Sequence, residues 1–250
     1  MYKKLLSIFL IAFVLFSFFT ACKFEDKTYI DAQIRLISGN PALWVHKGAD
    51  HINNTDNYKF CVTDLDQNGR LEVINSAIIG TGLYSESYYF EVDETYTTIV
   101  PWEHNTDSFR KKLEADIITD SADCFVNPES DERFFIFQDS FRETSAYNCN
   151  FKMCLTFENK TVTEKMLAYW ENSAATSDES ENYEIITNIV TADGEILTQD
   201  EFLNYADARF KNCEKHTVTF NWQKYDKDTF PSQDKLINLL AESYNGFNLK

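Results

Sequence analysis

The chain has 250 residues, of which 44% are apolar and 15% aromatic, and a formal net charge of −17 at pH 7. This composition predicts a folded protein with a packed core, and the many Tyr and Phe residues favour β-sheet. The excess of carboxylates excludes a protein that binds nucleic acid or that docks on anionic lipid by charge, because both of those surfaces are themselves negative.

The N-terminus has the pattern of an export signal. Two lysines precede an uncharged apolar run over residues 5–19. That run has the length of a signal-peptide core and is shorter than the roughly 20 residues of a membrane-spanning helix. Its last residue begins the sequence Phe19-Thr20-Ala21-Cys22, which resembles a bacterial lipobox except at Phe19, where Leu is commoner. The resemblance implies cleavage before Cys22 and a diacylglycerol on its thiol.

The sequence therefore predicts three parts. Residues 1–21 are a signal peptide, residues 22–28 are the lipidated Cys and a short tether, and residues 29–250 form a single α+β domain, with an internal boundary near 105–130 left open. We expect a lipoprotein on the extracytoplasmic face of the cell membrane, held by acyl chains such as palmitate. Two alternatives stay open: an ordinary cleaved signal in which Cys22 is incidental, and an uncleaved anchor.

The first half of the domain is expected to contain a short helix, several strands and a second helix. Ile30, Ile34 and Ile37 recur at helical spacing, and the Gly-Asn-Pro sequence at residues 39–41 ends that helix. A polar loop is expected over residues 46–56 and a helix over residues 108–117. Between them the alternating apolar pattern predicts strands over residues 58–63, 73–79, 87–92 and 96–100, with turns at 80–82 and 93–94.

The second half repeats the strand theme. Residues 161–171 fit either a helix or a strand, and the preceding turn signal at 159–160 favours a strand. Residues 172–182 are expected to be a mobile loop. Thr198 and Glu201 form a capping box that opens a helix to about residue 210. Other strands are expected over residues 133–138, 151–158, 184–191 and 216–222, and a last helix over 231–244. The predicted fold class is α+β, mainly antiparallel sheet with a few flanking helices.

The segment DLDQNGRLE over residues 64–72 is the one motif that carries recognisable chemistry. Oxygen-bearing residues recur at its positions 1, 3, 5 and 9, and a Gly stands at position 6, where the chain must turn sharply. Calcium takes six to eight hard oxygen ligands, which such a loop supplies. The expected ligands are the side chains of Asp64, Asp66 and Asn68, the carbonyl of Arg70, and Glu72 directly or through water. The alternative is a polar β-turn that needs no metal.

The context of this loop differs from a helix-flanked EF-hand, which needs Glu at position 12, where this chain has Asn75. Flanking strand-like residues make it similar to the calcium loops of FG-GAP repeats. It resembles more closely the single DxDxNGxxE hairpin of many uncharacterised bacterial lipoproteins, in which a helix precedes the loop and a Gly and a Tyr-rich strand follow. The matching residues here are Gly80, Gly82, Tyr84, Tyr88 and Tyr89. The resemblance covers roughly residues 30–100 and implies a structural calcium ion. Those lipoproteins have no assigned activity, so the resemblance implies none for this chain.

Besides Cys22, the domain has five cysteines, at positions 61, 124, 149, 154 and 213. An odd number permits at most two disulfides. Cys149 and Cys154 can pair only if a turn lies between them, because in one extended strand they lie about 16 Å apart. Buried, unpaired thiols are the other interpretation.

These features favour a non-enzymatic, calcium-stabilised module that binds an unknown envelope protein or glycan. The alternative is a hydrolase acting on the cell envelope or on polysaccharide, in which two of the many carboxylates do the chemistry. No GxSxG, P-loop or GxGxxG motif is present, and His46 and His51 have no metal-ligand spacing. No catalytic residue is therefore assigned.

Overall fold

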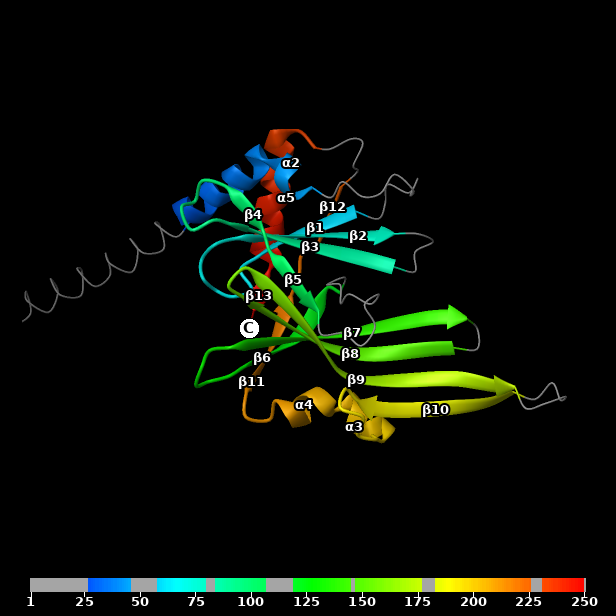
Figure 1. Ribbon diagram of the computed structural model, residues 1–250. Coiled ribbons are helices and arrows are strands. Elements are labelled where there is room, and N and C mark those ends of the chain that lie inside the picture. Colours follow the sequence, from blue (N-terminus) through cyan, green and yellow to red (C-terminus); the bar gives the residue numbers. More distant parts are fainter. Residues whose placement is uncertain are drawn as a thin grey trace, which may run out of the picture.

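The computed structural model describes residues 27–45, 58–79, 84–106, 119–144, 147–176, 183–225 and 231–249 (Figure 1). These segments form two β-sheets and several helices, which confirms the predicted α+β class with mainly antiparallel sheet. No helix within them is long and apolar enough to cross a membrane. The predicted signal peptide, Cys22, the loop at 46–56, the turn at 80–82 and the helix at 108–117 lie outside the described residues.

The smaller sheet has five strands, and all neighbouring pairs are antiparallel. In spatial order they are β12 (Gln223–Tyr225), β1 (Tyr58–Thr63), β2 (Glu72–Ile79), β3 (Tyr84–Val92) and β4 (Ile99–Pro101). Three helices pack on one face: residues 27–39, α2 (Pro41–Trp44) and α5 (Gln233–Gly246). Trp44, Phe60 and Leu240 are fully buried between these helices and the sheet.

The larger sheet has eight strands. Seven follow one another in the order β10 (Tyr183–Thr191), β9 (Thr161–Thr176), β8 (Tyr147–Glu158), β7 (Arg133–Thr144), β6 (Ser121–Val126), β11 (Glu214–Thr219) and β13 (Asn248–Leu249). The eighth, β5 (Glu103–Thr106), runs parallel to the start of β9. The two short helices α3 (Gln199–Leu203) and α4 (Tyr205–Arg209) follow β10.

A second core joins the two sheets. Along β1, Phe60 and Val62 face the helices, whereas Cys61 between them belongs to the core shared with the larger sheet, as the two-residue period of a strand requires. The ring of Phe157 on β8 lies 5.5 Å from that of Tyr89 on β3 and 5.2 Å from that of Phe135 on β7. Helices, smaller sheet and larger sheet therefore stack as three layers (Figure 1).

Most predicted elements occur where the pattern places them. β1 covers the expected residues 58–63, residues 161–171 are a strand, and the turn at Asn159 and Lys160 has both residues at positive φ (51° and 60°). The capping box closes at both ends, since Thr198 Oγ1 accepts from the amide of Glu201 and the Glu201 carboxylate accepts from the amide of Thr198. The prediction of a loop from residue 172 was wrong for 172–176, because β9 continues there between β8 and β10.

Candidate metal centre

The candidate site lies in the connection between β1 and β2, where the predicted calcium motif falls. Its backbone reverses direction through two left-handed residues, Gln67 at φ 56° and Gly69 at φ 81°. Gly tolerates this conformation because it has no Cβ, so position 6 of the motif has the conformational role that the sequence predicted. Left-handed Gln67 had no signal in the sequence.

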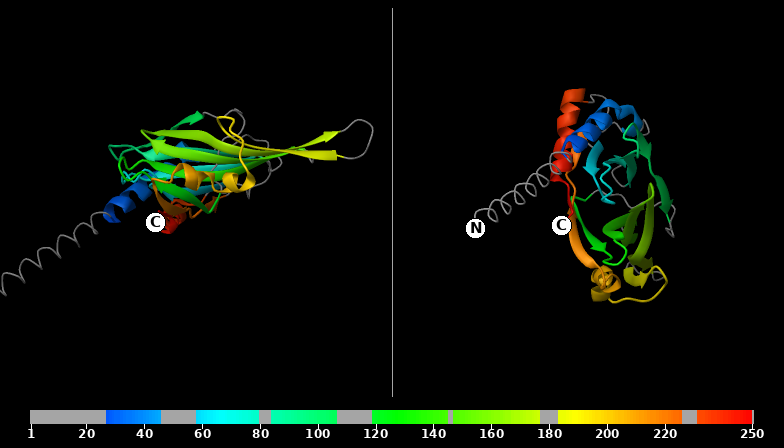
Figure 2. Two further views of the ribbon diagram at one scale, coloured as in Figure 1. Left: turned by 90° about the horizontal axis from the view of Figure 1, so that it is seen from below. Right: turned by 90° about the vertical axis from the view of Figure 1, so that its left-hand side faces the viewer.

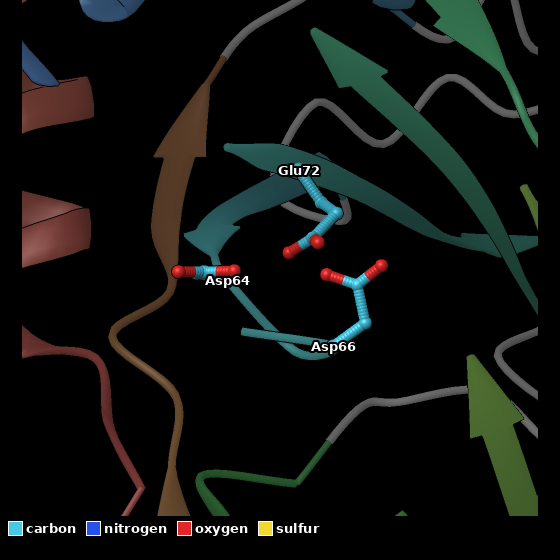
Figure 3. Close-up of side chains that lie close together, drawn as sticks. All are labelled: Asp64, Asp66 and Glu72. Carbon is cyan, nitrogen blue, oxygen red and sulfur yellow. The ribbon is translucent and has the colours of Figure 1, made fainter. Parts of the chain in front are cut away.

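Three carboxylates converge inside this turn. Asp64, Asp66 and Glu72 each offer an oxygen, and these oxygens lie within 4.8 Å of one another. Figure 3 shows the three carboxylates pointing toward a common centre, Glu72 from the start of β2 and the two aspartates from the loop. Because Glu72 pairs with Thr63 in the β1–β2 ladder, the fold fixes its position relative to the loop.

Glu72 is the most constrained of the three, with 1% of its surface exposed. Its Oε2 accepts hydrogen bonds from Thr63 Oγ1 and from the amide of Leu65, both at 2.9 Å. Its Oε1 is buried and has no hydrogen-bond partner among the described residues. A buried carboxylate oxygen without a partner is costly, and here it belongs to the group that faces the two aspartates.

The electrostatics of the cluster favour its neutralisation. Burial raises the pKa of Asp64 to about 6, and the Asp66 charge adds to the rise. Burial and the charges of Asp64 and Asp66 raise the pKa of Glu72 well above its usual range. Burial also raises the pKa of Asp66. Three carboxylates in this arrangement need protons or a cation to offset their repulsion and their lost hydration.

The side chain of Asn68, another predicted ligand, points elsewhere. Asn68 Nδ2 donates to Asp66 Oδ2 and to Glu91 Oε1, both at 2.7 Å, while its Oδ1 accepts from the amide of Arg70 at 2.7 Å. The Arg70 guanidinium forms an ion pair of 3.0 Å with Glu91. The side-chain oxygen of Asn68 is thus turned to the backbone and not to the carboxylates. Ligation through the Arg70 carbonyl stays a prediction.

Glu91, on β3, is a residue of this site that the sequence did not single out. It is fully buried and stands directly opposite Glu72 in the β2–β3 ladder. Its Oε1 holds both Asn68 and Arg70, and its Oε2 is buried without a hydrogen-bond partner among the described residues. A second buried glutamate beside Glu72 increases the negative charge that this end of the sheet must accommodate. Nothing in the alternation of β3 distinguishes it before the register is known.

Gln33, on the helix over residues 27–39, holds the second half of the loop. Its Nε2 donates to the carbonyl of Gly69 at 2.9 Å and its Oε1 accepts from the amide of Leu71 at 2.8 Å. The side chain is 2% exposed, so both contacts are shielded from water. The sequence could have indicated this role, because Gln33 lies beside Ile30, Ile34 and Ile37 on an apolar helix face, and a buried polar side chain there needs hydrogen-bond partners.

Arg133, at the start of β7, connects the loop to the larger sheet. Its guanidinium contacts Gln67 Oε1 at 2.9 Å and the Asp66 carbonyl at 3.4 Å, and it pairs with Asp131 at 3.1 Å. An open pocket of about 320 Å³ lies beside this contact. Its lining is strongly acidic and comprises Asp66, Ser130, Asp131, Glu132, Arg133, Phe157, Glu158 and Asn159.

Asn75 takes no part in this site, although it occupies the twelfth position of the motif. Its Nδ2 donates to the Trp44 carbonyl at 3.2 Å and to Tyr225 Oη at 2.9 Å in the helix-side core. The loop therefore differs from a helix-flanked EF-hand both in its flanking strands and in its closing residue.

None of the five cysteines among the described residues forms a disulfide. Cys149 and Cys154 lie on one continuous strand, β8, so no turn brings them together. Burial raises the pKa of Cys61, Cys124 and Cys154 to about 12. These thiols pack as small apolar groups, as the second interpretation of the sequence expected.

The cluster thus offers hard oxygen donors from a tight loop and one buried glutamate, which is the donor set of a divalent cation such as Ca²⁺. Three carboxylates leave further coordination positions for carbonyl oxygens or water. No family model matches the sequence, and neither the curated proteins nor the solved structures give a significant match.

Proposed function

We propose that this protein is a lipoprotein anchored on the extracytoplasmic face of the membrane through Cys22, and that its α+β domain is a binding module stabilised by calcium. The observation that carries the calcium site is the buried Glu72, whose carboxylate faces Asp64 and Asp66 and whose Oε1 has no hydrogen-bond partner among the described residues. A divalent cation bound there supplies that oxygen with a partner and cancels the repulsion among three carboxylates.

The role of the cation is structural. The loop that would hold it contacts all three layers: Gln33 reaches it from the helices, Glu72 and Glu91 belong to the smaller sheet, and Arg133 reaches it from the larger sheet. A cation that stabilises this loop therefore stabilises the junction of the layers. Gly69 and Gln67, already in left-handed conformations, support a loop that is preformed for the ion.

Calcium titration of the full chain in nonionic detergent tests the site. Isothermal calorimetry is expected to show one calcium site in the weak extracellular class, with a dissociation constant on the order of 10⁻⁴–10⁻³ M. Asp64→Asn is expected to weaken binding strongly, because it removes a charged ligand. Asp193→Asn, which removes the same charge from an exposed turn, is the matched control. The proposal is contradicted if the wild type shows no heat of calcium binding, or if Asp64→Asn binds calcium as the wild type does.

The anchor has a separate test. Cells that express the full chain are grown with radioactive palmitate, and the protein is expected to carry label that is lost in Cys22→Ser. Label absent from the wild type, or retained by the variant, removes the anchor from the proposal without touching the calcium site.

A further inference from the structure

The outer edge of β10 has the properties of a docking site for another strand. β10 is the last strand of the larger sheet, and its described neighbour on the other side is β9. The β9–β10 hairpin runs past the ends of the neighbouring strands and away from the rest of the molecule (Figure 2). An edge strand in such a position presents unpaired backbone groups to solvent.

The direction of these groups follows from two hydrogen bonds at the end of β10. The Ile189 carbonyl accepts from the amide of Leu197, and the amide of Thr191 donates to the Glu195 carbonyl, both at 2.8 Å. These odd-numbered residues thus turn their backbone groups away from β9. Because backbone direction alternates along a strand, Ile185 and Thr187 also direct their N–H and C=O groups outward. The segment after β10 covers this edge only from residue 189 onward.

The part of the edge that the segment after β10 leaves open has one exposed apolar side chain on each face of the sheet, next to the exposed polar Thr187 and Asn188. Ile185 is 70% exposed and Ile186 is 51% exposed, and successive strand residues point to opposite faces. Exposed edge strands are ordinarily protected by Lys, Pro or a bulge. Residues 183–188 contain no Lys and no Pro, and their register with β9 is continuous.

The charge around this edge indicates what kind of strand it accepts. In the described segments 166–176 and 183–208 the chain has seven Asp and Glu residues and no Lys or Arg. On the neighbouring strand β9, Glu171 lies opposite Asn188, and Asp193 and Glu195 lie in the exposed turn that follows β10. A second copy of this chain would bring the same negative charges to the contact, which disfavours self-pairing.

We propose that the edge formed by residues 183–188 binds an extended, basic segment of a partner protein by strand addition. Backbone hydrogen bonds to Ile185 and Thr187 would supply the pairing, and apolar side chains of the incoming strand would cover Ile185 and Ile186. Its Lys or Arg side chains would be attracted to acidic residues such as Glu171 on β9, which lies opposite Asn188. The inference rests on the binding role proposed above and names its surface, but it does not depend on the calcium site.

The test uses two synthetic peptides with the full chain in nonionic detergent. The first is a fluorescent octapeptide of alternating Val and Lys. The second has the same sequence with alternate backbone amides methylated, so that its charge is kept and its pairing edge is blocked. Fluorescence anisotropy is expected to show saturable binding of the first peptide and at least about tenfold weaker binding of the second, because strand addition depends on the backbone amides.

Variants of the protein locate the contact. Thr187→Pro removes an outward N–H without breaking the ladder to β9, and Ile185→Lys places a positive charge on the edge. Each is expected to weaken binding of the first peptide by about tenfold or more. Leu203→Ser, at an exposed apolar side chain on α3, is the matched control and is expected to leave binding unchanged. Circular dichroism checks that the variants fold, and Ile185→Lys retains the test if Thr187→Pro does not.

Equal binding of the two peptides overturns the proposal and shows charge attraction only. Absence of binding overturns it as well, and so does self-association of the chain that Thr187→Pro abolishes, since the occupant is then a second copy. The calcium titration is run on the same preparation. A calcium response with no peptide binding removes this inference alone, whereas peptide binding with no calcium response removes the calcium proposal alone.

Discussion

Replacing Glu72 by Gln is the sharpest perturbation of the candidate site, because it removes one charge and keeps the shape of the side chain. The Gln carbonyl can still accept from Thr63 Oγ1 and from the amide of Leu65, as Glu72 Oε2 does. Its amide would then face Asp64 and Asp66 and donate to them. Two opposite effects are expected: the calcium-free variant is no less stable than the wild type, and its response to calcium is lost.

The magnitudes follow from linkage. With a dissociation constant of about 10⁻⁴–10⁻³ M, roughly 5 mM calcium stabilises the wild type by about 1–2 kcal/mol. For a chain of this size that corresponds to a rise in melting temperature of about 2–9 °C. Relief of one buried, repelled carboxylate is expected to raise the melting temperature of the calcium-free variant by a few degrees at most, since about 1 kcal/mol is at stake.

The assay is thermal denaturation followed by circular dichroism, in chelator and in calcium. Glu195→Gln, which removes the same charge from an exposed turn, is the control and is expected to keep the full calcium response. Retention of that response by Glu72→Gln would refute the assignment of Glu72 as a ligand. A calcium-free Glu72→Gln that melts well below the wild type would refute the reasoning about its unpartnered oxygen.

Four further outcomes are expected. Gly69→Ala and Gly194→Ala, both at left-handed positions with open space for a Cβ (φ 81° and 87°), should each cost about 1 kcal/mol in denaturant unfolding, but only the first should weaken calcium binding in calorimetry. Gln33→Ala should lower the free energy of unfolding by about 2–3 kcal/mol, measured in urea, because two buried backbone groups lose their partner. The calcium-induced rise in melting temperature should shrink as the pH falls through about 6, since Asp64 must lose its proton to bind the ion. Without calcium, the effect of pH on stability is opposite. A carboxyl whose pKa rises from 3.8 to about 6 on folding stabilises the folded state at low pH, and this stabilisation is lost as the pH rises through 6. Under native conditions a thiol reagent should modify Cys213 first, because the other four thiols of the described residues are buried, and unreduced protein in denaturant should show no disulfide.

Sequence pattern alone determined the strand and helix types of most segments, because each carries its own period. Residues 58–63 are a strand, and Thr198 and Glu201 cap a helix. Asp64 and Asp66 are near neighbours because they are two residues apart on a turning loop, and Glu72 joins them because the hairpin places it opposite Thr63. Such local features need no knowledge of the fold. The signal peptide and Cys22 are also sequence inferences, and they stay predictions.

Tertiary structure alone decided which residues surround the loop that carries Asp64 and Asp66. Glu91 stands beside Glu72 because of the β2–β3 register, and a shift of one residue would point it to the other face of the sheet. Gln33 and Arg133 reach the loop from 36 and 67 residues away in sequence, a helix on one side and the larger sheet on the other. Their positions depend on how three layers pack, which no local pattern encodes. The same holds for the edge of β10, whose exposure follows from being last in its sheet.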